Sequence, residues 1–385
     1  MNENKPLVSL VVPTKNRYPY LIKLIELLLS FNLDKRFELI IQDNNEDNSS
    51  FLKYLEGKHI PYLKYYYDPT PMPIGANCDK AILHSTGEFV SFIGDDDFVT
   101  RNFMPCVEWM KTNNVDCVFP RRIMYYWPDY CEKEDEKAAV HFESFSNQIV
   151  YFDTTKVLSD LFESGCLGIG DIPMIYHGIV KRSVLEKIWN NCGTLFPGAS
   201  PDISSGICLC MVLDNYASFK FPIIIAGNSR TGGGGQRVIK HHAVTDFSKL
   251  TFLPKDTEKK WCKRIPKIWS NVTIWCESVV ETLNVWNRQE LVEKIDFEKF
   301  YTYFMVNHSY YWAMAYKLSN DKPMLILNSL KGAVVLQTKN FVKAILNLMH
   351  INTVKSRTKV HGISSSSELI SYFEEKGYFF DNYFK

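Results

Sequence analysis

Three consecutive carboxylates, Asp95, Asp96 and Asp97, follow an apolar run at residues 89–93 that is typical of a buried strand. Like charges at this spacing repel one another, so we expect a cation to compensate them. Carboxylate oxygens suit Mn²⁺ or Mg²⁺, and these ions complete their coordination with water and substrate phosphates. The run therefore predicts a metal–diphosphate site. The alternative is an acidic turn that caps the next helix, although such a turn needs only one Asp.

Buried-strand patterns alternate with helical ones in the first part of the chain. The apolar run at residues 7–12 is followed by helical spacing of apolar residues over 21–28. This alternation predicts an α/β fold with a mostly parallel sheet flanked by helices. Ligands bind at the carboxyl ends of the strands in such sheets. Residues 14–17, 43–45 and 95–97 all follow predicted strands, so we expect these polar clusters to converge on one crevice.

The rest of the chain predicts a division into two regions. Residues 125–150 are polar and irregular, and we then predict three helices over 155–163, 182–189 and 203–213 and a last strand over 221–226. From about residue 253 the pattern is helical to the end. We therefore predict an α/β domain over residues 1–250 and a helical C-terminal region over residues 251–385.

Composition excludes several classes of protein. The 385 residues carry a net charge of +1, which gives no electrostatic basis for binding nucleic acid. Ten cysteines without a Cys-x-x-Cys pair fit neither a zinc pattern nor a disulfide framework and indicate a reducing compartment. The N-terminus lacks the apolar core of a signal peptide, and no segment approaches the roughly 18 apolar residues of a spanning helix. We therefore expect a cytoplasmic protein.

Three motifs, taken in order, resemble those of family 2 glycosyltransferases with the GT-A fold. They are VSLVVPTKNR at residues 8–17, IIQDNN at residues 40–45 and GEFVSFIGDDD at residues 87–97. The resemblance extends over residues 5–240. It implies an inverting transferase that moves a sugar from a nucleotide-diphosphate donor, most often UDP-linked, with the help of Mn²⁺ or Mg²⁺. The acceptor it implies is a glycan or a lipid-linked glycan.

The resemblance also implies roles for particular residues. Asp43 would accept the N3–H of a uracil ring. The metal ion would be held by carboxylates of Asp95, Asp96 and Asp97. The family's Asp-x-Asp pattern can be aligned with this run in two ways. Which of the three carboxylates ligate the metal therefore stays open. The residues implied for the donor are Pro13, Thr14, Arg17, Asp43, Asn45, Asn77, Lys80, Asp95 and Asp96.

Sugar transfer also needs a base that removes the proton from the acceptor hydroxyl. The family usually supplies an Asp or Glu well downstream of the metal motif, and Asp202 fits by position. The alternative is that Asp202 only caps the helix predicted to begin near residue 203. Asp171 and Asp214 are the next candidates.

A basic stretch at residues 322–367 contains seven cations and no acidic residue. Within it, residues 341–349 predict a helix with one apolar face, and Lys339 and Lys343 lie opposite. This pattern is typical of a helix on anionic lipid, which would make the protein peripheral on the inner face of the cytoplasmic membrane. A helix that packs on the catalytic domain is the alternative. Association into a homo-oligomer also stays open.

Two other functions fit parts of the pattern. A sugar nucleotidyltransferase would usually show an early Gly-rich loop that carries Arg, but residues 10–25 contain no Gly. A carbohydrate-binding or scaffold protein on a degenerate transferase core would have no need of the acidic cluster. Both are less consistent with the sequence than a glycosyltransferase.

Overall fold

The computed structural model describes most of the chain. The described residues are 5–130, 137–232, 246–247, 250, 253–348 and 357–384. Within these residues, the side chains at 309, 340–348 and 357 are not described. The apolar face predicted at 341–349, together with Lys343, therefore lies outside the described side chains. Lys355 lies outside the described residues.

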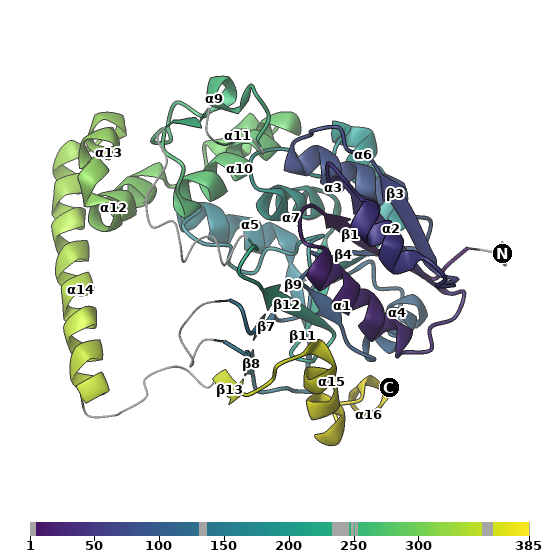
Figure 1. The fold of residues 1–385 in the computed structure, drawn as a ribbon. Coiled ribbons are helices and arrows are strands. Elements are labelled where there is room, and N and C mark those ends of the chain that lie inside the picture. The colour runs from purple at the N-terminus through teal and green to yellow at the C-terminus, as the bar shows by residue number, and fades with distance from the viewer. Residues whose placement is uncertain are drawn as a thin grey trace.

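An eight-stranded sheet lies at the centre of the fold (Figure 1). Strand β1 (Val8–Thr14) pairs in parallel with β2 (Phe37–Asp43) on one side and with β4 (Phe89–Phe92) on the other. Four of the seven pairings are parallel, which confirms the prediction of a mostly parallel sheet. The order is β3-β2-β1-β4-β10-β6-β11-β9, with β3 (Leu63–Tyr67), β10 (Ile179–Lys181), β6 (Cys117–Val118), β11 (Asn215–Phe219) and β9 (Ile149–Asp153).

A second, five-stranded sheet contains segments for which the sequence predicted no strand. The prediction that residues 125–150 are irregular is wrong, because β7, β8 and β9 lie in or overlap this range. These strands are short, and in β8 the buried Val140 and Phe142 alternate with polar residues, so the overall composition stays polar. The order is β13-β8-β7-β12-β5, with β13 (Arg357–His361), β8 (Ala139–Glu143), β7 (Ile123–Tyr126), β12 (Ile224–Asn228) and β5 (Phe98–Val99).

Two hydrophobic cores cover the two faces of the main sheet. Val11 faces one core while Leu10 and Val12 face the other, because successive side chains of a strand point to opposite sides. The first core is covered by α3 (Ile74–Leu83), α5 (Thr154–Glu163), α6 (Arg182–Cys192), α7 (Pro201–Val212), α10 (Asn271–Val285), α11 (Gln289–Val292) and α12 (Phe297–Asn307). The second is covered by α1 (Tyr18–Leu29), α2 (Ser49–Leu55), α4 (Phe103–Thr112), α15 (Ser366–Glu375) and α16 (Phe380–Tyr383).

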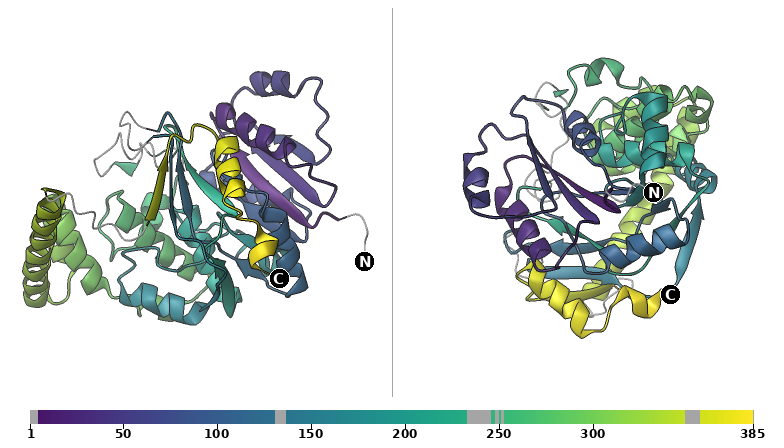
Figure 2. Two further views of the ribbon diagram at one scale, coloured as in Figure 1. Left: turned by 90° about the horizontal axis from the view of Figure 1, so that it is seen from below. Right: turned by 90° about the vertical axis from the view of Figure 1, so that its right-hand side faces the viewer.

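The C-terminal region is mostly helical, as predicted, and β13 is its one described strand. Figures 1 and 2 show that α14 (Lys322–Leu348) stands at the edge of the molecule, away from the main sheet. Within the described residues, no helix is both long and apolar enough to cross a membrane. The boundary near residue 250 stays a prediction. The remaining short elements are α9 (Thr257–Lys260), the 3₁₀ turn η3 (Ser309–Tyr311) and α13 (Trp312–Leu318).

Candidate active site

The three polar clusters meet at the carboxyl ends of β1, β2 and β4. The Thr14 hydroxyl donates to Asp95 Oδ2 at 2.7 Å, which joins the first cluster to the third. The backbone N–H of Asn16 donates to Asn45 Oδ1 at 2.5 Å, which joins the first to the second. The parallel pairing of the three strands brings these residues to one edge, so the expected convergence occurs.

Arg17 is the cation that directly faces two of the carboxylates. Its Nη2 lies 2.7 Å from Asp95 Oδ1, and its Nη1 lies 3.3 Å from Asp96 Oδ1. Burial raises the pKa of Asp95; Arg17 opposes this shift, and the charge of Asp96 adds to it. Burial likewise raises the pKa of Asp96, and the charge of Asp97 adds to that shift. The guanidinium carries one positive charge, whereas the two ionised carboxylates of Asp95 and Asp96 carry two negative charges.

Asp97 is held differently from its two neighbours. Its Oδ2 accepts from the Gly94 N–H and the Tyr176 hydroxyl, each at 2.7 Å, and lies 2.7 Å from His177 Nε2. Its Oδ1 accepts from the Gly227 N–H, also at 2.7 Å. Burial alone would raise the pKa of Asp97, but the charge and hydrogen bond of His177 reverse the shift and lower it. Four partners occupy the roughly four acceptor sites of a carboxylate, so Asp97 fixes the surrounding chain.

We predict that Asp97→Asn lowers the free energy of unfolding by about 3 kcal/mol or more. The amide would present a donor to partners that are themselves donors. Urea unfolding measures the change, and Asp116→Asn is the matched control, because its ion pair with Lys181 is only half-buried and should cost at most about 1 kcal/mol. Equal stability of the two variants would show that Asp97 does not hold this region together.

His177 was not among the predicted site residues. It has a left-handed backbone, with φ +63°, and its N–H donates to the Phe92 carbonyl at the end of β4. The ring is buried, and its Nδ1 has no hydrogen-bond partner among the described residues. Its sequence spacing from Asp97 is 80 residues, and no local pattern in the sequence signals such a contact.

Asp96 is covered by the end of β12 and the residues after it. Its Oδ2 accepts from the Ser229 hydroxyl at 2.5 Å, and its carbonyl accepts from Trp127 Nε1 at 2.9 Å. A Cβ on Gly227 would lie only 1.8 Å from the Asp96 carbonyl oxygen. Only glycine allows this approach, so Gly227 fixes how closely β12 covers the acidic turn.

Asp43 lies at the end of β2 and is fully buried. Its Oδ2 accepts from the hydroxyls of Tyr18 and Tyr65 at 2.5 and 2.6 Å. Its Oδ1 accepts from the N–H and the side-chain amide of Asn45 at 2.9 and 2.5 Å. All of its acceptor sites are therefore used within the chain, and a uracil N3–H could bind Asp43 only where one of these donors moves away.

The remaining predicted donor residues lie around the same edge. Pro13 pairs in register with Gln42 of β2. Lys80 of α3 forms an ion pair with Asp68, whose carbonyl accepts from the side-chain amide of Asn44 in the second cluster. Asn77 is buried, and its Oδ1 has no hydrogen-bond partner among the described residues. A role of Lys80 and Asn77 in donor binding stays a prediction.

Asp202 lies in the first turn of α7 and is half-buried. Burial raises the pKa of Tyr176, and the charges of Asp97, Asp96 and Asp202 add to that shift, so Asp202 lies within electrostatic range of the tyrosine that donates to Asp97. The loop before α7 is held by α10, because Ser200 N–H donates to Ser278 Oγ at 2.8 Å.

The alternative bases lie in other surroundings. Asp171 forms a 2.7 Å ion pair with Arg121, and both side chains are largely exposed. Asp214 lies just before β11, where its carbonyl accepts from Thr154 N–H, the residue that begins α5. Of these three carboxylates, Asp202 is the one among the main charges that raise the pKa of Tyr176, which favours Asp202.

The carboxylates fit a divalent cation. Within the described residues, no three His, Cys, Asp or Glu side chains are grouped to hold a metal ion. Mg²⁺ and Mn²⁺ need only one or two protein carboxylates when a substrate diphosphate supplies further oxygens. Asp97 Oδ2 already has three partners and Oδ1 has one, whereas Asp95 and Asp96 are buried with one guanidinium beside them among the described residues. The surplus of negative charge there matches a cation bound together with a diphosphate.

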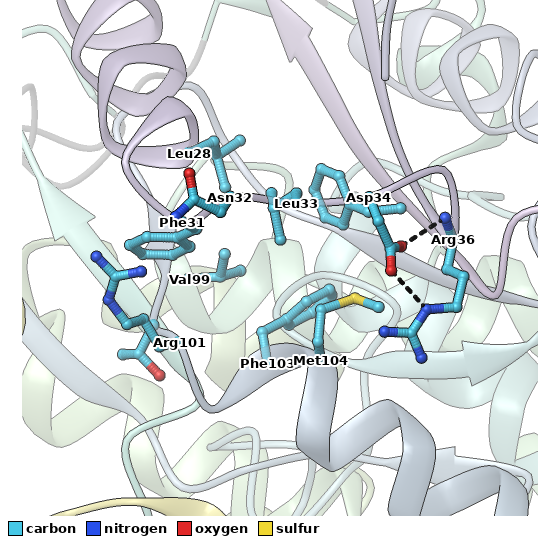
Figure 3. A pocket seen from close by; sticks show the side chains of 12 residues that line it. Leu28, Phe31, Asn32, Leu33, Asp34, Arg36, Val99, Arg101, Phe103 and Met104 are labelled. Atoms are coloured by element: carbon cyan, nitrogen blue, oxygen red, sulfur yellow. Dashed lines mark hydrogen bonds and ion pairs between the residues drawn. The ribbon is translucent and has the colours of Figure 1, made fainter. Parts of the chain in front are cut away.

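Two cavities lie outside this cluster. One, of about 200 Å³, opens between the ends of α1 and β5 and the starts of β2 and α4, and includes Leu28, Phe37 and Phe103 (Figure 3). It lies at the amino ends of the strands, on the edge away from the polar clusters. The other, of about 310 Å³, lies between the start of α3, the loop before α7 and α10, beside Ala76, Ala199 and Glu277.

A mostly parallel sheet with a buried acidic turn at its carboxyl edge defines an α/β protein of the class that binds its ligands at this edge. Residues 9–169 match the family described as Glycosyl transferase family 2. This part of the chain is therefore similar to that family, and the α/β fold described above is of the GT-A type.

Two curated relatives match shorter stretches. The putative colanic acid biosynthesis glycosyl transferase WcaA of Escherichia coli (strain K12) is 27% identical over 100 residues, which are 26% of this chain and 36% of the relative. The uncharacterized protein y4gI of Sinorhizobium fredii (strain NBRC 101917 / NGR234) is 30% identical over 134 residues, which are 33% of this chain and 14% of the relative. The matched segments thus span well under half of either relative.

Among solved structures, the chain is similar to S. aureus TarS 1-349 in complex with UDP-GlcNAc. The sequence identity is 15% and the TM-score is 0.46, and the match covers 83% of this chain and 79% of that chain. TarS 1-349 without ligand gives 14% identity and a TM-score of 0.45 over 84% and 78% of the two chains.

Proposed function

We propose that this protein is an inverting glycosyltransferase that moves a sugar from a nucleotide-diphosphate donor to a glycan hydroxyl. The single observation that carries the proposal is the buried pair Asp95 and Asp96 at the carboxyl edge of the sheet, whose one ion-pair partner among the described residues is the Arg17 guanidinium. A surplus of buried negative charge at a ligand-binding edge suits a cation and a diphosphate. The family of residues 9–169 supports transfer of a sugar.

The donor's nucleotide lies, in this proposal, across the ends of β1 and β2. Thr14 and Arg17 position Asp95, while Asp43 holds Tyr18 and Asn45 in place around the base. UDP is the nucleotide that the motif resemblance favours. A bound Mn²⁺ or Mg²⁺ would be held by Asp95 and Asp96 and would supply positive charge to the leaving diphosphate.

Asp202 is the proposed general base. Its carboxylate takes the proton from the acceptor hydroxyl, whose oxygen attacks the anomeric carbon on the face opposite the diphosphate. One displacement from the opposite face inverts the configuration at that carbon. The position of Asp202 in the first turn of α7, in electrostatic range of Tyr176, supports this role.

The acceptor class rests on the relatives. WcaA is described as a putative colanic acid biosynthesis glycosyl transferase, which supports a polysaccharide or its lipid-linked precursor as acceptor. A location on the inner face of the cytoplasmic membrane and assembly into a homo-oligomer stay predictions.

A thermal-shift screen of sugar nucleotides with and without Mn²⁺ tests the proposal. A ligand that binds only the folded protein stabilises it by about 2.7 kcal/mol at roughly 100 times its Kd. We expect at least one nucleotide-diphosphate sugar to raise the melting temperature, and to raise it more with Mn²⁺. The absence of any shift across uridine, guanosine, adenosine and thymidine donors would contradict the proposal.

The same assay tests Asp43. We predict that Asp43→Ala weakens binding of the free nucleoside diphosphate by roughly tenfold or more, because it leaves the Tyr18 and Tyr65 hydroxyls without their acceptor. Asp116→Ala, at a half-buried ion pair, should bind as the unmodified protein does. Unchanged affinity of Asp43→Ala for every nucleoside diphosphate that binds the unmodified protein would remove Asp43 from the site.

A further inference from the structure

Large apolar side chains are exposed mainly in one part of the molecule. Among the described residues, eleven of the nineteen such side chains lie between residues 303 and 336. Tyr310 is 89% exposed, Leu330 62% and Val334 64%. We call the exposed residues of 310–339 the α13–α14 surface. Its large apolar members are Tyr310, Trp312, Met314, Met324, Ile326, Leu327, Leu330, Val334, Val335 and Leu336.

Helix α14 has a second apolar face besides the one that packs on the protein. Leu325 is buried, and a Cβ on Gly332 would lie 3.1 Å from Val306 of α12, so this face is already covered. Leu327, Leu330 and Val334 follow the spacing of one helical face and lie on the opposite side, because each residue turns about 100° around the axis. Figures 1 and 2 show α14 standing at the edge of the molecule, and the exposed fractions of these three side chains show that the second face is uncovered.

The charge of the α13–α14 surface indicates what covers it. Residues 310–339 contain four lysines, at 317, 322, 331 and 339, and a single acidic residue, Asp321. Asp321 caps α14, since its Oδ1 accepts from Met324 N–H at 3.0 Å. A second copy would therefore bring like charge against like charge, with no other carboxylate in the surface to pair the lysines. Exposed Trp and Tyr beside lysines suit the interface of an anionic bilayer.

We propose that the α13–α14 surface docks on an anionic lipid surface, with Leu327, Leu330 and Val334 entering the headgroup region and the lysines facing lipid phosphates. No described helix spans a bilayer, so the attachment is peripheral. This inference uses none of the site residues, so it does not depend on the sugar donor.

Flotation with vesicles tests the proposal. The purified full chain should bind vesicles of phosphatidylcholine with phosphatidylglycerol, bind phosphatidylcholine alone far less, and release as salt rises. A triple variant tests the role of the charge, with Gln in place of Lys317, Lys331 and Lys339. Its affinity for anionic vesicles should fall about a hundredfold, since each cation near an anionic surface raises the affinity by roughly a factor of five. The matched control carries Gln in place of three lysines that are also exposed but lie far from this surface, Lys35, Lys53 and Lys187. This control should bind the vesicles as the unmodified protein does.

The apolar face is tested separately. A variant with Ser in place of Leu327, Leu330 and Val334 should no longer bind vesicles. The control variant carries Leu52→Ser and Leu83→Ser, at exposed positions of α2 and α3, and should still bind them. Donor hydrolysis and circular dichroism that match those of the unmodified protein establish that each variant is folded. If the serine variant does not fold, the lysine variant alone tests the proposal. Two outcomes overturn the proposal: no preference of the unmodified protein for anionic vesicles, or a dimer in sedimentation that the serine variant dissociates.

Discussion

Asp202→Asn should lower the rate of sugar transfer about 10²–10⁴-fold, the usual effect of removing a general base. The amide cannot accept the proton of the acceptor hydroxyl, whereas the proposed diphosphate site is formed by other residues, those of the acidic cluster. Donor affinity should therefore stay within about twofold of that of the unmodified protein. Initial rates at saturating donor and acceptor, with donor Kd measured in parallel, separate the two effects.

Asp171→Asn and Asp214→Asn are the matched controls for this experiment. Both remove one carboxylate from the helical side of the sheet, and both should leave the chemical step nearly unchanged. A collapse of donor affinity in Asp202→Asn together with a normal residual rate would make Asp202 a structural residue. Loss of transfer in one of the two controls instead would place the base there.

Replacing Asp95 and Asp96 together with Asn should abolish metal-dependent turnover, a loss of about a thousandfold or more, while the protein stays folded. These two carboxylates repel one another and Asp97, and burial raises the pKa of each. Neutral amides relieve that repulsion, so we expect the variant without ligand to be at least as stable as the unmodified protein. Turnover is followed as release of nucleoside diphosphate, and stability by urea unfolding.

The comparison with Asp97→Asn sharpens this test. All three substitutions remove a charge from the same turn, but only Asp97 accepts from both Gly227 and Tyr176. Stability should therefore fall in Asp97→Asn and hold in the double variant. Full activity of the double variant, or activity that survives excess chelator, would contradict the metal site.

The elements that place the site could be predicted because they are local. Continuous apolar runs identified β1, β2 and β4, and the rule that ligands bind at the carboxyl edge brought residues 14–17, 43–45 and 95–97 together. The distinct roles within the acidic run could not be predicted, because they depend on a turn. Asp97 N–H donates to the Gly94 carbonyl at 3.2 Å, so the side-chain alternation of an extended strand does not hold there.

The partners of the acidic turn were missed because they come from far along the chain. Tyr176, Gly227 and Ser229 lie 79, 130 and 133 residues from the carboxylates they contact. Tyr176 forms an isolated bridge with Phe92 just before β10, whereas Gly227 lies in β12, which ends just before Ser229 and pairs with β7 in the second sheet. Since β7 lies at the start of a stretch predicted to be irregular, no sequence pattern predicted that this sheet would cover Asp96.

Release of nucleoside diphosphate from a panel of sugar nucleotides, without acceptor, tests the central claim most directly. A glycosyltransferase slowly transfers its donor sugar to water, so the proposal predicts slow release for at least one donor. That release should require Mn²⁺ or Mg²⁺, stop with chelator, and be absent in the double variant of Asp95 and Asp96. Release that is equal in the unmodified protein and the double variant, or no release and no binding for any donor, would contradict a metal-assisted transferase.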